Sequence, residues 1–463
     1  MTILQKILYL IFVVLILCIP AFYNGFPLLF PDTVGYVSTG FRGVVGAARL
    51  WLYGGFLRHV SLCETVWLVI FVQGLIISGV VYLMFKYFMK SKYSYHLFII
   101  YLLIVGTTTA ISFHVSMLMP DIFTPVVILS FALLLLAKNM STRDRLITIC
   151  LFLTAVGMHN SHIVLSVGLL LSVAAIYSLK KWRLSCNNLG VNLKKIGLIG
   201  ALIFCSHIGV CTLHYSLGGD FSTTRGSRIF LFARLCDFGI AQSYLQENCP
   251  SSQDSICNDL SILGTSPTFL WGNKSQSYLN KTGGFSKENE IYYKKLTTDI
   301  LTRPKYLKKY IIKSMEAMFM QFFTFQIRTK GDSYGIQSAW ISIYYNTYNL
   351  ASKNSRQMKK KDSSTAIERA NAIQFFVLGI AGLFFLILLW DDKILQSQKG
   401  IALFILVALF INAFIVGATS GVYDRYQSRV AWLITLPAFW YIWSKVETFI
   451  PIKNLRKDSS KID

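Results

Sequence analysis

Long apolar runs recur along the chain and alternate with short polar segments. Most runs hold roughly 17–25 residues, the length that an α-helix needs to cross about 30 Å of hydrocarbon. The fifth run is shorter, which predicts a tilted or broken helix. The first run has no small-residue cleavage site after it, so it is typical of a retained helix and not of a signal peptide. We predict ten membrane-spanning helices, at residues 4–22, 64–88, 96–113, 119–137, 145–158, 163–179, 196–216, 371–390, 401–419 and 431–445.

Basic residues gather in every second connection between these spans. With a cytoplasmic N-terminus, four of the five inner segments are rich in Lys and Arg, as the positive-inside rule requires. The inner segments are then 86–92, 138–145, 180–195, 391–399 and the tail after residue 445. The outer side receives the turns 114–121, 159–162 and 420–430, besides two longer segments. Both termini are therefore expected in the cytoplasm.

The spans divide the chain into four parts. Residues 1–216 form an N-terminal transmembrane module of about seven helices, which includes the first outer loop, 23–63. Residues 217–370 form a mostly helical extracytoplasmic domain, residues 371–445 about three further transmembrane helices, and residues 446–463 a cytoplasmic tail. At about 150 residues, the outer segment has the size of one domain. The predicted fold class is an all-α polytopic membrane protein.

Composition supports this fold class and limits the kinds of binding partner that we expect. Apolar residues make up 54% of the chain and charged residues only 14%, well below the usual share of a soluble protein. The net charge of +23 is dispersed over the inner loops and the outer segment, without a basic-aromatic binding module. We therefore expect membrane lipids as partners and no nucleic acid; the oligomeric state is not predicted.

Two cysteines in the long outer segment have the spacing of a small closed loop. Cys249 and Cys257 are separated by seven residues that include Pro250. Such a pair is typical of a disulfide in an oxidising compartment, whereas a zinc site would need more ligands. We predict the bond Cys249–Cys257, with Cys236 free or as an alternative partner.

The first outer loop carries an acidic residue just after an apolar span. Asp32 stands in the string Phe30–Tyr36, and a carboxylate at the edge of the lipid is costly to hold there. A helix that starts after Pro31 would place the hydroxyls of Thr33 and Tyr36 on its side. Asp32 is therefore either a functional carboxylate or an ordinary helix N-cap.

Three further outer turns carry polar residues of the kinds that perform chemistry. Asp121 follows Pro120 at the junction of the third and fourth spans, where a helix cap is again the alternative. His159 and His162 lie between the fifth and sixth spans and have the spacing to bind a metal or accept protons, although a polar turn at the membrane surface is the more common explanation. The turn before the last span carries a further group that would suit a lipid phosphate or simple interfacial anchoring, namely Arg425, Tyr426 and Arg429.

Taken together, these turns predict one site at the outer membrane face. Every outer turn of the hydrophobic part carries Asp, His or Arg, while the interiors of the spans carry few polar residues. A channel would need polar residues inside its spans, and alternating access favours broken helices with polar sites at the midplane. The pattern favours a site that opens sideways to lipid.

These motifs resemble the GT-C superfamily of integral-membrane glycosyltransferases, which use lipid-phosphate-linked sugars. Phe30–Tyr36 resembles the acidic motif of the first outer loop, and Met119–Asp121 resembles the second acidic turn. Asp424–Tyr426, followed by Arg429 and the run to Pro437, resembles the Arg-Tyr-to-proline ending of several such families. The segment from Phe230 to Trp271 is also similar to a group of bacterial multi-pass membrane proteins, so a bacterial inner membrane is the expected location.

The resemblance implies specific roles for these residues. Asp32 would be the base that accepts the proton of the acceptor, and Asp121 would orient the acceptor or hold a divalent metal ion with Asp32 or His159. Arg425 and Arg429 would stabilise the departing polyprenyl phosphate, next to Tyr36, His159 and Tyr426 as further substrate contacts. The outer domain would select the acceptor through its arginines Arg225, Arg228 and Arg234.

Two other functions stay open. In a lipid or polysaccharide transporter or assembly protein without catalysis, Asp32 and Asp121 would be caps and the arginines would bind head groups. In a membrane acyltransferase, His159 or His162 would be the base. Close approach of Asp32, Asp121 and Arg425 would favour the transferase, and wide separation would exclude it.

Overall fold

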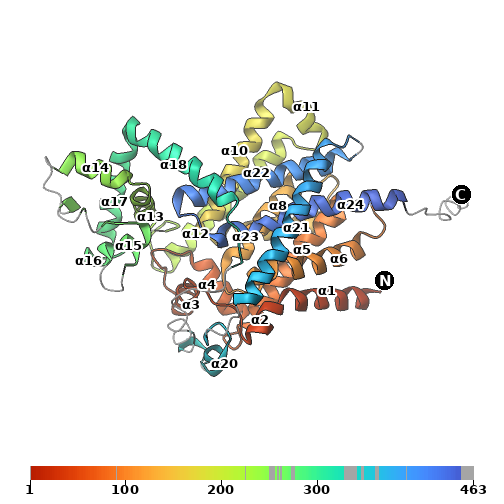
Figure 1. Cartoon of the computed structure of the whole chain (residues 1–463), viewed down its shortest axis with the longest axis horizontal. Coiled ribbons are helices and arrows are strands. Elements are labelled where there is room, and N and C mark those ends of the chain that lie inside the picture. The colour runs from red at the N-terminus through yellow and green to blue at the C-terminus, as the bar shows by residue number, and fades with distance from the viewer. Residues whose placement is uncertain are drawn as a thin grey trace, which may run out of the picture.

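The computed structural model describes residues 2–89, 91–224, 226–249, 256–257, 260, 263–272, 277–327, 341, 343–345, 349–359, 364–392 and 394–449. Within these ranges the regular structure is helical, apart from one isolated β-bridge. A large helical bundle lies beside a smaller helical domain (Figure 1). The predicted tail 446–463 lies outside the described residues from residue 450 onward.

The apolar runs form the bundle, and each of the ten predicted spans lies on one or more helices. In the described part of the chain, five helices are long and apolar enough to cross a membrane, namely α5, α10, α12, α21 and α22, while three apolar helices are shorter. The described chain is therefore helical, with five helices that could cross a membrane, and the number of ten crossings stays a prediction. The bundle helices are α1 (Ile3–Leu17), α5 (Trp67–Phe88), α6 (Ser94–Thr108), α7 (Ile111–Val115), α8 (Phe123–Leu136), α9 (Thr142–Gly157), α10 (Asn160–Ser178), α12 (Leu193–Ser216), α21 (Ser364–Trp390), α22 (Gln396–Thr419) and α24 (Thr435–Phe449).

Short helices lie in the connections between these long ones. In the first outer loop, α3 and α4 cross so closely that a Cβ atom on Gly40 would lie 2.1 Å from the carbonyl oxygen of Gly54. Any larger residue at position 40 would separate the two helices. The connecting helices are α2 (Ile19–Asn24), α3 (Thr33–Arg42), α4 (Trp51–Val60), η1 (Pro120–Ile122), α11 (Lys180–Asn188), α20 (Asn349–Asn354), α23 (Asp424–Ala431) and η5 (Trp432–Ile434).

The connections that were predicted for the inner side contact one another. Lys86 Nζ lies 2.6 Å from Asp144 Oδ2, and Lys445 Nζ lies 2.5 Å from Asp391 Oδ2. The first pair joins two of the predicted inner segments, and the second joins a third inner segment to the end of the last span. The start of α1 and the end of α24 lie on the opposite side of the molecule from the small domain (Figure 1). The two ends of the described chain and the small domain thus lie on opposite sides of the bundle (Figure 1).

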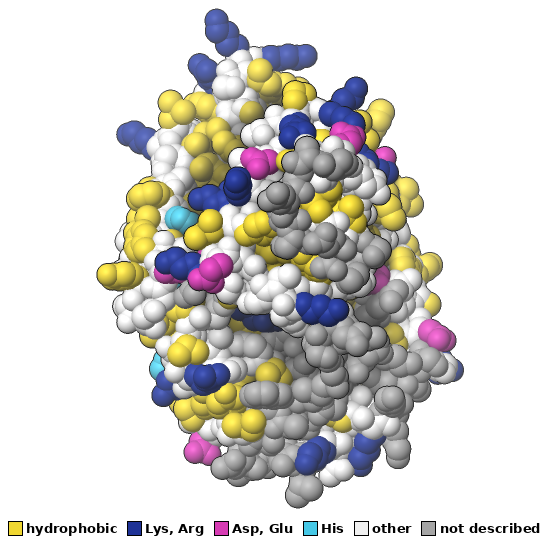
Figure 2. All heavy atoms as spheres, turned by 90° about the vertical axis from the view of Figure 1, so that its left-hand side faces the viewer, with side chains coloured by type: hydrophobic (Ala, Val, Ile, Leu, Met, Phe, Trp, Pro, Cys, Tyr) yellow, Lys and Arg dark blue, Asp and Glu magenta, His cyan; other side chains and the backbone are white. Residues whose placement is uncertain are grey.

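The small domain has a hydrophobic core of its own within the predicted segment 217–370. Phe232, Phe269 and Tyr293 pack ring against ring at its centre. On the face seen in Figure 2, Lys and Arg side chains are scattered among apolar and acidic ones. Its helices are α13 (Ser227–Asp237), α14 (Ile240–Asn248), α15 (Ser266–Leu270), α16 (Tyr278–Lys281), α17 (Lys287–Thr302) and α18 (Pro304–Phe322).

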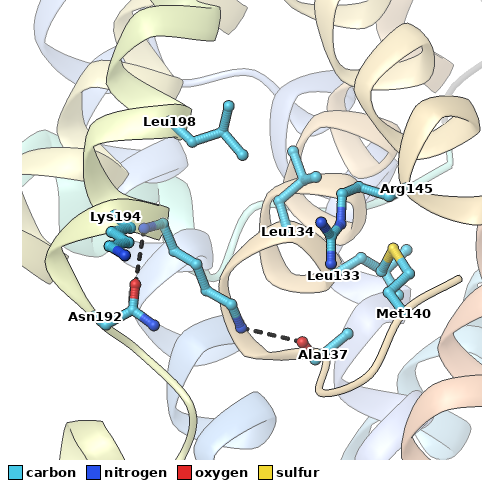
Figure 3. Close-up of a pocket in the computed structure, with 9 residues that line it drawn as sticks. Leu133, Leu134, Ala137, Met140, Arg145, Asn192, Lys194 and Leu198 are labelled. Atoms are coloured by element: carbon cyan, nitrogen blue, oxygen red, sulfur yellow. Dashed lines mark hydrogen bonds between the residues drawn. The ribbon is translucent and has the colours of Figure 1, made fainter. Parts of the chain in front are cut away.

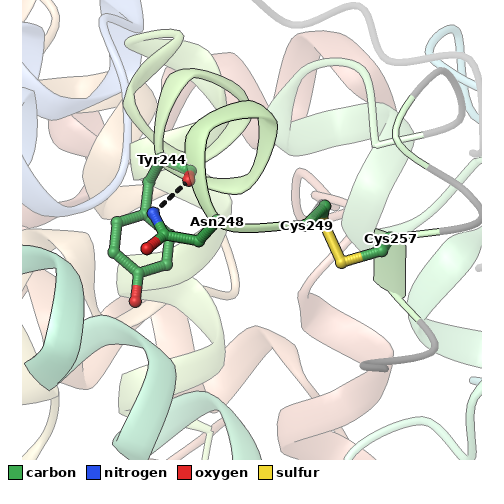
Figure 4. Close-up of a disulfide and its surroundings, with 4 residues drawn as sticks. All are labelled: Tyr244, Asn248, Cys249 and Cys257. Carbon is green, nitrogen blue, oxygen red and sulfur yellow. Dashed lines mark hydrogen bonds between the residues drawn. A yellow bond between two sulfur atoms is a disulfide. The ribbon is translucent and has the colours of Figure 1, made fainter. Parts of the chain in front are cut away.

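A disulfide closes the end of α14 in this domain. Cys249 and Cys257 are bonded, with 5.4 Å between their Cα atoms, and the loop begins beside Tyr244 and Asn248 (Figure 4). Cys236 is a free thiol, buried in the core of the domain. The domain thus pairs the two cysteines that stand at the predicted spacing.

The long helix α18 joins the domain to the bundle by packing along α22. A Cβ atom on Gly417 would lie 3.1 Å from the carbonyl oxygen of Ala317, so glycine permits this close approach. Arg234 Nε donates a hydrogen bond of 2.8 Å to the carbonyl oxygen of Gly417, and its Nη1 lies 2.9 Å from Asp237. The prediction that Arg234 contacts an acceptor is therefore wrong, because its guanidinium is buried in this junction. Arg228 is exposed, and Arg225 lies outside the described residues.

Candidate functional site

The first outer loop and the second acidic turn are joined by the single β-bridge. Leu28 pairs in parallel with Met117, and the amide of Leu118 donates to the carbonyl oxygen of Leu28 over 3.0 Å. The paired segments have the same pattern, three apolar residues followed by Pro-Asp. Each bridge residue therefore stands four positions before an aspartate, Asp32 in one segment and Asp121 in the other. The bridge brings the two carboxylates to the same place.

Asp32 occupies the N-cap position of α3, but its carboxylate does not cap the helix. It accepts no hydrogen bond from the first turn of α3, all of which is described. Instead, Oδ1 lies 2.5 Å from Arg49 Nη2 and Oδ2 lies 3.3 Å from Arg425 Nη1. Burial disfavours the charged form, but the two guanidiniums outweigh burial and lower the pKa of Asp32. The geometry thus does not support the alternative of a simple cap, and Asp32 is an anion at neutral pH.

Asp121 lies deeper and is held by two arginines of α23. Its Oδ1 lies 3.1 Å from Arg429 Nη1 and 3.7 Å from Arg425 Nε. Only 4% of the Asp121 side chain and 2% of the Arg429 side chain are exposed. Arg429 Nη2 donates a further hydrogen bond of 3.1 Å to Asn412 Oδ1 of α22. No capping hydrogen bond to Asp121 is present in the described turn η1, so this residue also serves an ion-pair network and not a helix end.

Arg425 connects the two carboxylates. Its guanidinium contacts Asp32 through Nη1 and Asp121 through Nε, and it stacks 4.0 Å from the ring centroid of Phe30. Sequence analysis placed Asp32, Asp121, Arg425 and Arg429 on one side of the membrane, and the structure brings all four into one network. The three arginines and two aspartates of this network have a formal charge of +1.

The network has a closed side and an open side. Asp121 and Arg429 are enclosed by protein, whereas 33% of the Asp32 side chain, 23% of Arg49 and 14% of Arg425 are exposed. A ligand that approaches from outside would therefore meet Asp32 first, with a guanidinium on each side of it. An anion is the ligand that the excess positive charge favours.

The two predicted tyrosines pack against the arginines of this network. Tyr36 is buried, with its ring 5.7 Å from the guanidinium carbon of Arg49 and edge-on to Tyr53. The ring of Tyr426 lies 5.0 Å from Arg425, and its hydroxyl bonds to Ser420 over 2.9 Å. Both rings hold the arginines in position by cation–π contact.

The histidines have separate structural partners. His162 is fully buried, and its two ring nitrogens bond to Thr124 and to the carbonyl oxygen of Ala155. His159 caps α10 by accepting a hydrogen bond from the amide of Ser161. Burial, assisted by Arg429, lowers the pKa of His159 to about 4, so its ring is neutral at physiological pH. Because both ring nitrogens of His162 are already bonded, this residue is not free to act as the base of an acyltransferase.

The donor set around the two carboxylates does not fit a divalent cation. Guanidiniums already face both Asp32 and Asp121 and leave the network positive, whereas a metal site needs an excess of anionic oxygen ligands. No group of three or more His, Cys, Asp or Glu suited to a metal occurs in the described part of the chain. The geometry therefore does not support the divalent metal ion that was predicted at Asp32, Asp121 or His159.

Sequence reasoning missed Arg49 and the residues that hold the loop. A Cβ atom on Gly35 would lie 2.9 Å from the guanidinium of Arg49, so this glycine makes the room in which Arg49 reaches Asp32. The side chain of Gln357 bonds to both the amide and the carbonyl oxygen of Leu29 over 3.0 Å. The repeated Pro-Asp pattern could have indicated that the two loops pair, but no local signal distinguishes Arg49 from the other arginines of its loop.

The small domain reaches the network through the end of α18. Gln321 is buried there, and its side chain accepts from the amide of Tyr423 over 2.8 Å and donates to the carbonyl oxygen of Tyr423 over 2.9 Å. The carboxylate of Asp424 accepts from the amide of Gln326 over 3.0 Å. The residue pair directly before Arg425 is thus fixed by the chain that leaves the small domain.

The chain matches no family model, no curated protein and no solved structure.

Proposed function

We propose that this protein is a membrane glycosyltransferase that moves a sugar from a polyprenyl-phosphate-linked donor to a lipid, glycan or protein acceptor at the extracytoplasmic face. The observation that carries the proposal is the position of Arg425 between Asp32 and Asp121, with Arg49 on the other side of Asp32. A carboxylate that removes a proton and a cation that receives a phosphate are the two groups that such a transfer requires. They lie in contact on the open side of the network.

The phosphate of the donor would bind to Arg425 and Arg49. Both guanidiniums are partly exposed, and arginine forms paired hydrogen bonds to phosphate oxygens. Arg429 is enclosed and stays with Asp121, so its role is to hold Asp121 and the start of α23 in place. The formal charge of +1 would fall towards neutrality when the phosphate binds.

Phosphate binding would also change Asp32. In the free protein two arginines stabilise its carboxylate, which makes it a weak base. A phosphate that draws Arg425 and Arg49 away would remove part of this stabilisation and raise the basicity of Asp32. The base would thus become effective only when the donor is present.

The transfer itself balances with these groups. The acceptor hydroxyl or amine attacks C1 of the sugar from the face opposite the phosphate, and a new bond from C1 to the acceptor forms. The bond from C1 to the phosphate oxygen breaks, and its electron pair leaves with polyprenyl phosphate. The acceptor proton passes to Asp32. Because the attack comes from the face opposite the phosphate, the configuration at C1 is inverted. General-base assistance of this kind contributes roughly 10²–10⁴-fold.

The predicted topology supports the location of the reaction. The positive-inside pattern would place the network at the outer face of a bacterial inner membrane, with both termini in the cytoplasm. Polyprenyl carriers would reach the network from the lipid at the side of the bundle. The small domain, joined to Tyr423, would cover the site and take part in the choice of acceptor.

The test uses the full-length protein, purified in detergent, with a panel of polyprenyl-phosphate sugars and envelope lipid extracts as acceptors. Release of polyprenyl phosphate is measured by mass spectrometry. Asp32→Asn should reduce release at least 100-fold while donor binding persists, and the control Glu316→Gln, which removes an exposed carboxylate of α18, should leave it unchanged. Full release by Asp32→Asn would overturn the proposal. Donor binding without release by the unchanged protein would instead favour a lipid transporter or assembly protein.

A further inference from the structure

A second basic region lies far from the Asp32 network, among the segments predicted for the inner side. There, α8, α9 and α12 surround a cavity of about 250 Å³. Arg145 lies on one wall, and Asn192 and Lys194 lie on the other (Figure 3). The proposed transfer reaction uses none of these residues.

The cavity is basic at its rim and apolar at its base. Three of its nine lining residues carry positive charge, namely Arg145, Lys194 and Lys195, and none of the nine is acidic. The nearest acidic residue in sequence, Asp144, is already bound by Lys86. The rim therefore has no anionic partner among the described residues that line it, and an anionic ligand fits it.

The base of the cavity determines which kind of anion fits. Leu133, Leu134 and Met140 are buried beneath the basic rim, and Leu198 stands beside them with 39% of its surface exposed. A free phosphate or a sugar phosphate would gain nothing from these side chains. An acyl chain beside an anionic head group would cover the exposed surface of Leu198 and gain the free energy of burial.

One of the cations is fixed in place before any ligand arrives. Lys195 Nζ donates to the carbonyl oxygens of Leu135 and Ala137, over 2.9 and 3.0 Å, at the end of α8. Asn192 holds the backbone of Lys195 by accepting from its amide over 3.0 Å (Figure 3). Lys195 thus serves the end of α8 and contributes charge, whereas Lys194 and Arg145 have side chains that are free to move onto a ligand.

The cavity lies at the start of a helix that could cross a membrane. The cavity opens at the first turn of α12, a helix of 24 residues that is long and apolar enough to cross a membrane. The first turn of such a helix stands at the depth of the lipid head groups, where clusters of Lys and Arg attract anionic lipids. We propose that this cavity binds the phosphate and one acyl chain of an anionic glycerophospholipid.

The test places the full-length protein in nanodiscs of phosphatidylcholine that contain a minor fraction of phosphatidylglycerol. Native mass spectrometry then counts the phosphatidylglycerol that stays bound after release from the disc. Arg145→Gln combined with Lys194→Gln should weaken retention by roughly 25-fold, since each basic residue near the surface contributes roughly fivefold. Lys195 is left unchanged because it holds the end of α8.

The matched control removes the same amount of charge from the inner segment 180–195, which also carries Lys194, but outside the cavity. Lys180 and Lys181 lie exposed on α11, and Lys180→Gln with Lys181→Gln should leave retention within about twofold. Equal losses in both double variants would show a diffuse effect of surface charge and would overturn the proposal.

A third variant separates the lipid from a free anion and does not depend on the basic residues. Leu198→Gln changes an exposed side chain, so folding should persist, and it should lower retention of phosphatidylglycerol by removing apolar cover. Glycerol 3-phosphate and inorganic phosphate should bind far more weakly than the lipid. The proposal is wrong if either free anion binds as tightly as phosphatidylglycerol, or if Leu198→Gln retains the lipid in full.

Discussion

Arg425 Nη1 lies 3.3 Å from Asp32 Oδ2, although 393 residues separate the two in the chain. The contact joins the first outer loop to the turn before the last helix. Arg425 also touches Asp121, so the carboxylates of both outer turns share one cation. The two carboxylates differ in depth, and this difference leads to the first prediction.

Loss of the charge at Asp121 should destabilise the protein far more than loss at Asp32. Asp121→Asn leaves the enclosed guanidinium of Arg429 without its anion, which costs about 3–5 kcal/mol. Asp32→Asn changes an ion pair on the open side and should cost about 1 kcal/mol or less. Thermal unfolding in detergent measures both. The double variant Asp121→Asn with Arg429→Gln should recover part of the loss, and equal effects of the two single variants would contradict this assignment of depth.

Gly35→Ala should displace Arg49 from Asp32 without destabilising the fold. The new methyl group would lie 2.9 Å from the guanidinium, which moves because it is the end of a flexible side chain. Alanine is also favoured over glycine inside a helix by about 1 kcal/mol, so the melting temperature should not fall. Release of polyprenyl phosphate should drop by the same factor that is expected for Arg49→Gln.

The matched control for this change is Gly79→Ala in α5. No atom lies within 4 Å of a Cβ atom built on Gly79, so the same substitution adds a methyl group in open space. Release should stay at the level of the unchanged protein. If Gly35→Ala behaves like Gly79→Ala, Gly35 is not needed for the position of Arg49.

Stability should fall as the pH drops from 6.5 towards 4, in part through His114. Burial and the nearby Arg429 and Arg425, only partly offset by Asp121, lower the pKa of this ring to about 4, from an ordinary value of 6.5. Between these values the unfolded chain binds a proton and the folded chain does not, so folding loses stability as the pH falls, by on the order of 3 kcal/mol below pH 4. Melting temperatures across this range measure the slope.

His114→Gln should flatten that slope, whereas His96→Gln changes an exposed ring and should not. Asp32 contributes in the same direction at lower pH. Its lowered pKa means that its ion pairs persist above the ordinary pKa of Asp and are lost as the pH falls through the lowered value. A slope between pH 6.5 and 4 that His114→Gln leaves intact would assign it to other groups.

Removal of the Cys249–Cys257 bond should weaken the small domain alone. A closed loop of this length contributes roughly 2–3 kcal/mol by restricting the unfolded chain. Cys249→Ser with Cys257→Ser should therefore speed limited proteolysis within 226–322 and leave cleavage of the bundle unchanged. Cys63→Ser, at an exposed free thiol of the first outer loop, is the control. Faster cleavage throughout the chain would show that the domain and the bundle unfold together.

Local patterns predicted what depends on neighbours in the chain. Apolar runs of helical length all lie on helices, because burial in lipid or protein and internal hydrogen bonding act on each segment alone. Some helices begin or end at other residues than the predicted spans do. The first helix stops at Leu17, since Cys18 ends α1 and a second helix with Pro20 in its first turn begins at Ile19. The eighth run begins its helix at Ser364, well before the predicted residue 371.

Contacts between distant segments were predicted only as far as topology required them. The side of the membrane brought Asp32, Asp121 and Arg425 into one region, but their contact depends on the bridge between Leu28 and Met117. The Pro-Asp pattern that both segments share does not by itself specify that they pair. Arg49 was missed for the same reason. Its choice among the arginines of the first loop depends on the space left by Gly35, which is a property of the packed helix and not of the loop sequence.

The two hydrogen bonds between Gln321 and Tyr423 connect the small domain mechanically to the ion-pair network. Helix α18 packs in the core of that domain, and its last turn contacts Tyr423 through Gln321. A rigid tilt of the domain must therefore either break these bonds or move the start of α23. Arg425 is two residues away and would move relative to Asp32. An acceptor that touches only the small domain would thus alter the strength of the base at a distance, and binding of acceptor and donor would be mechanically coupled.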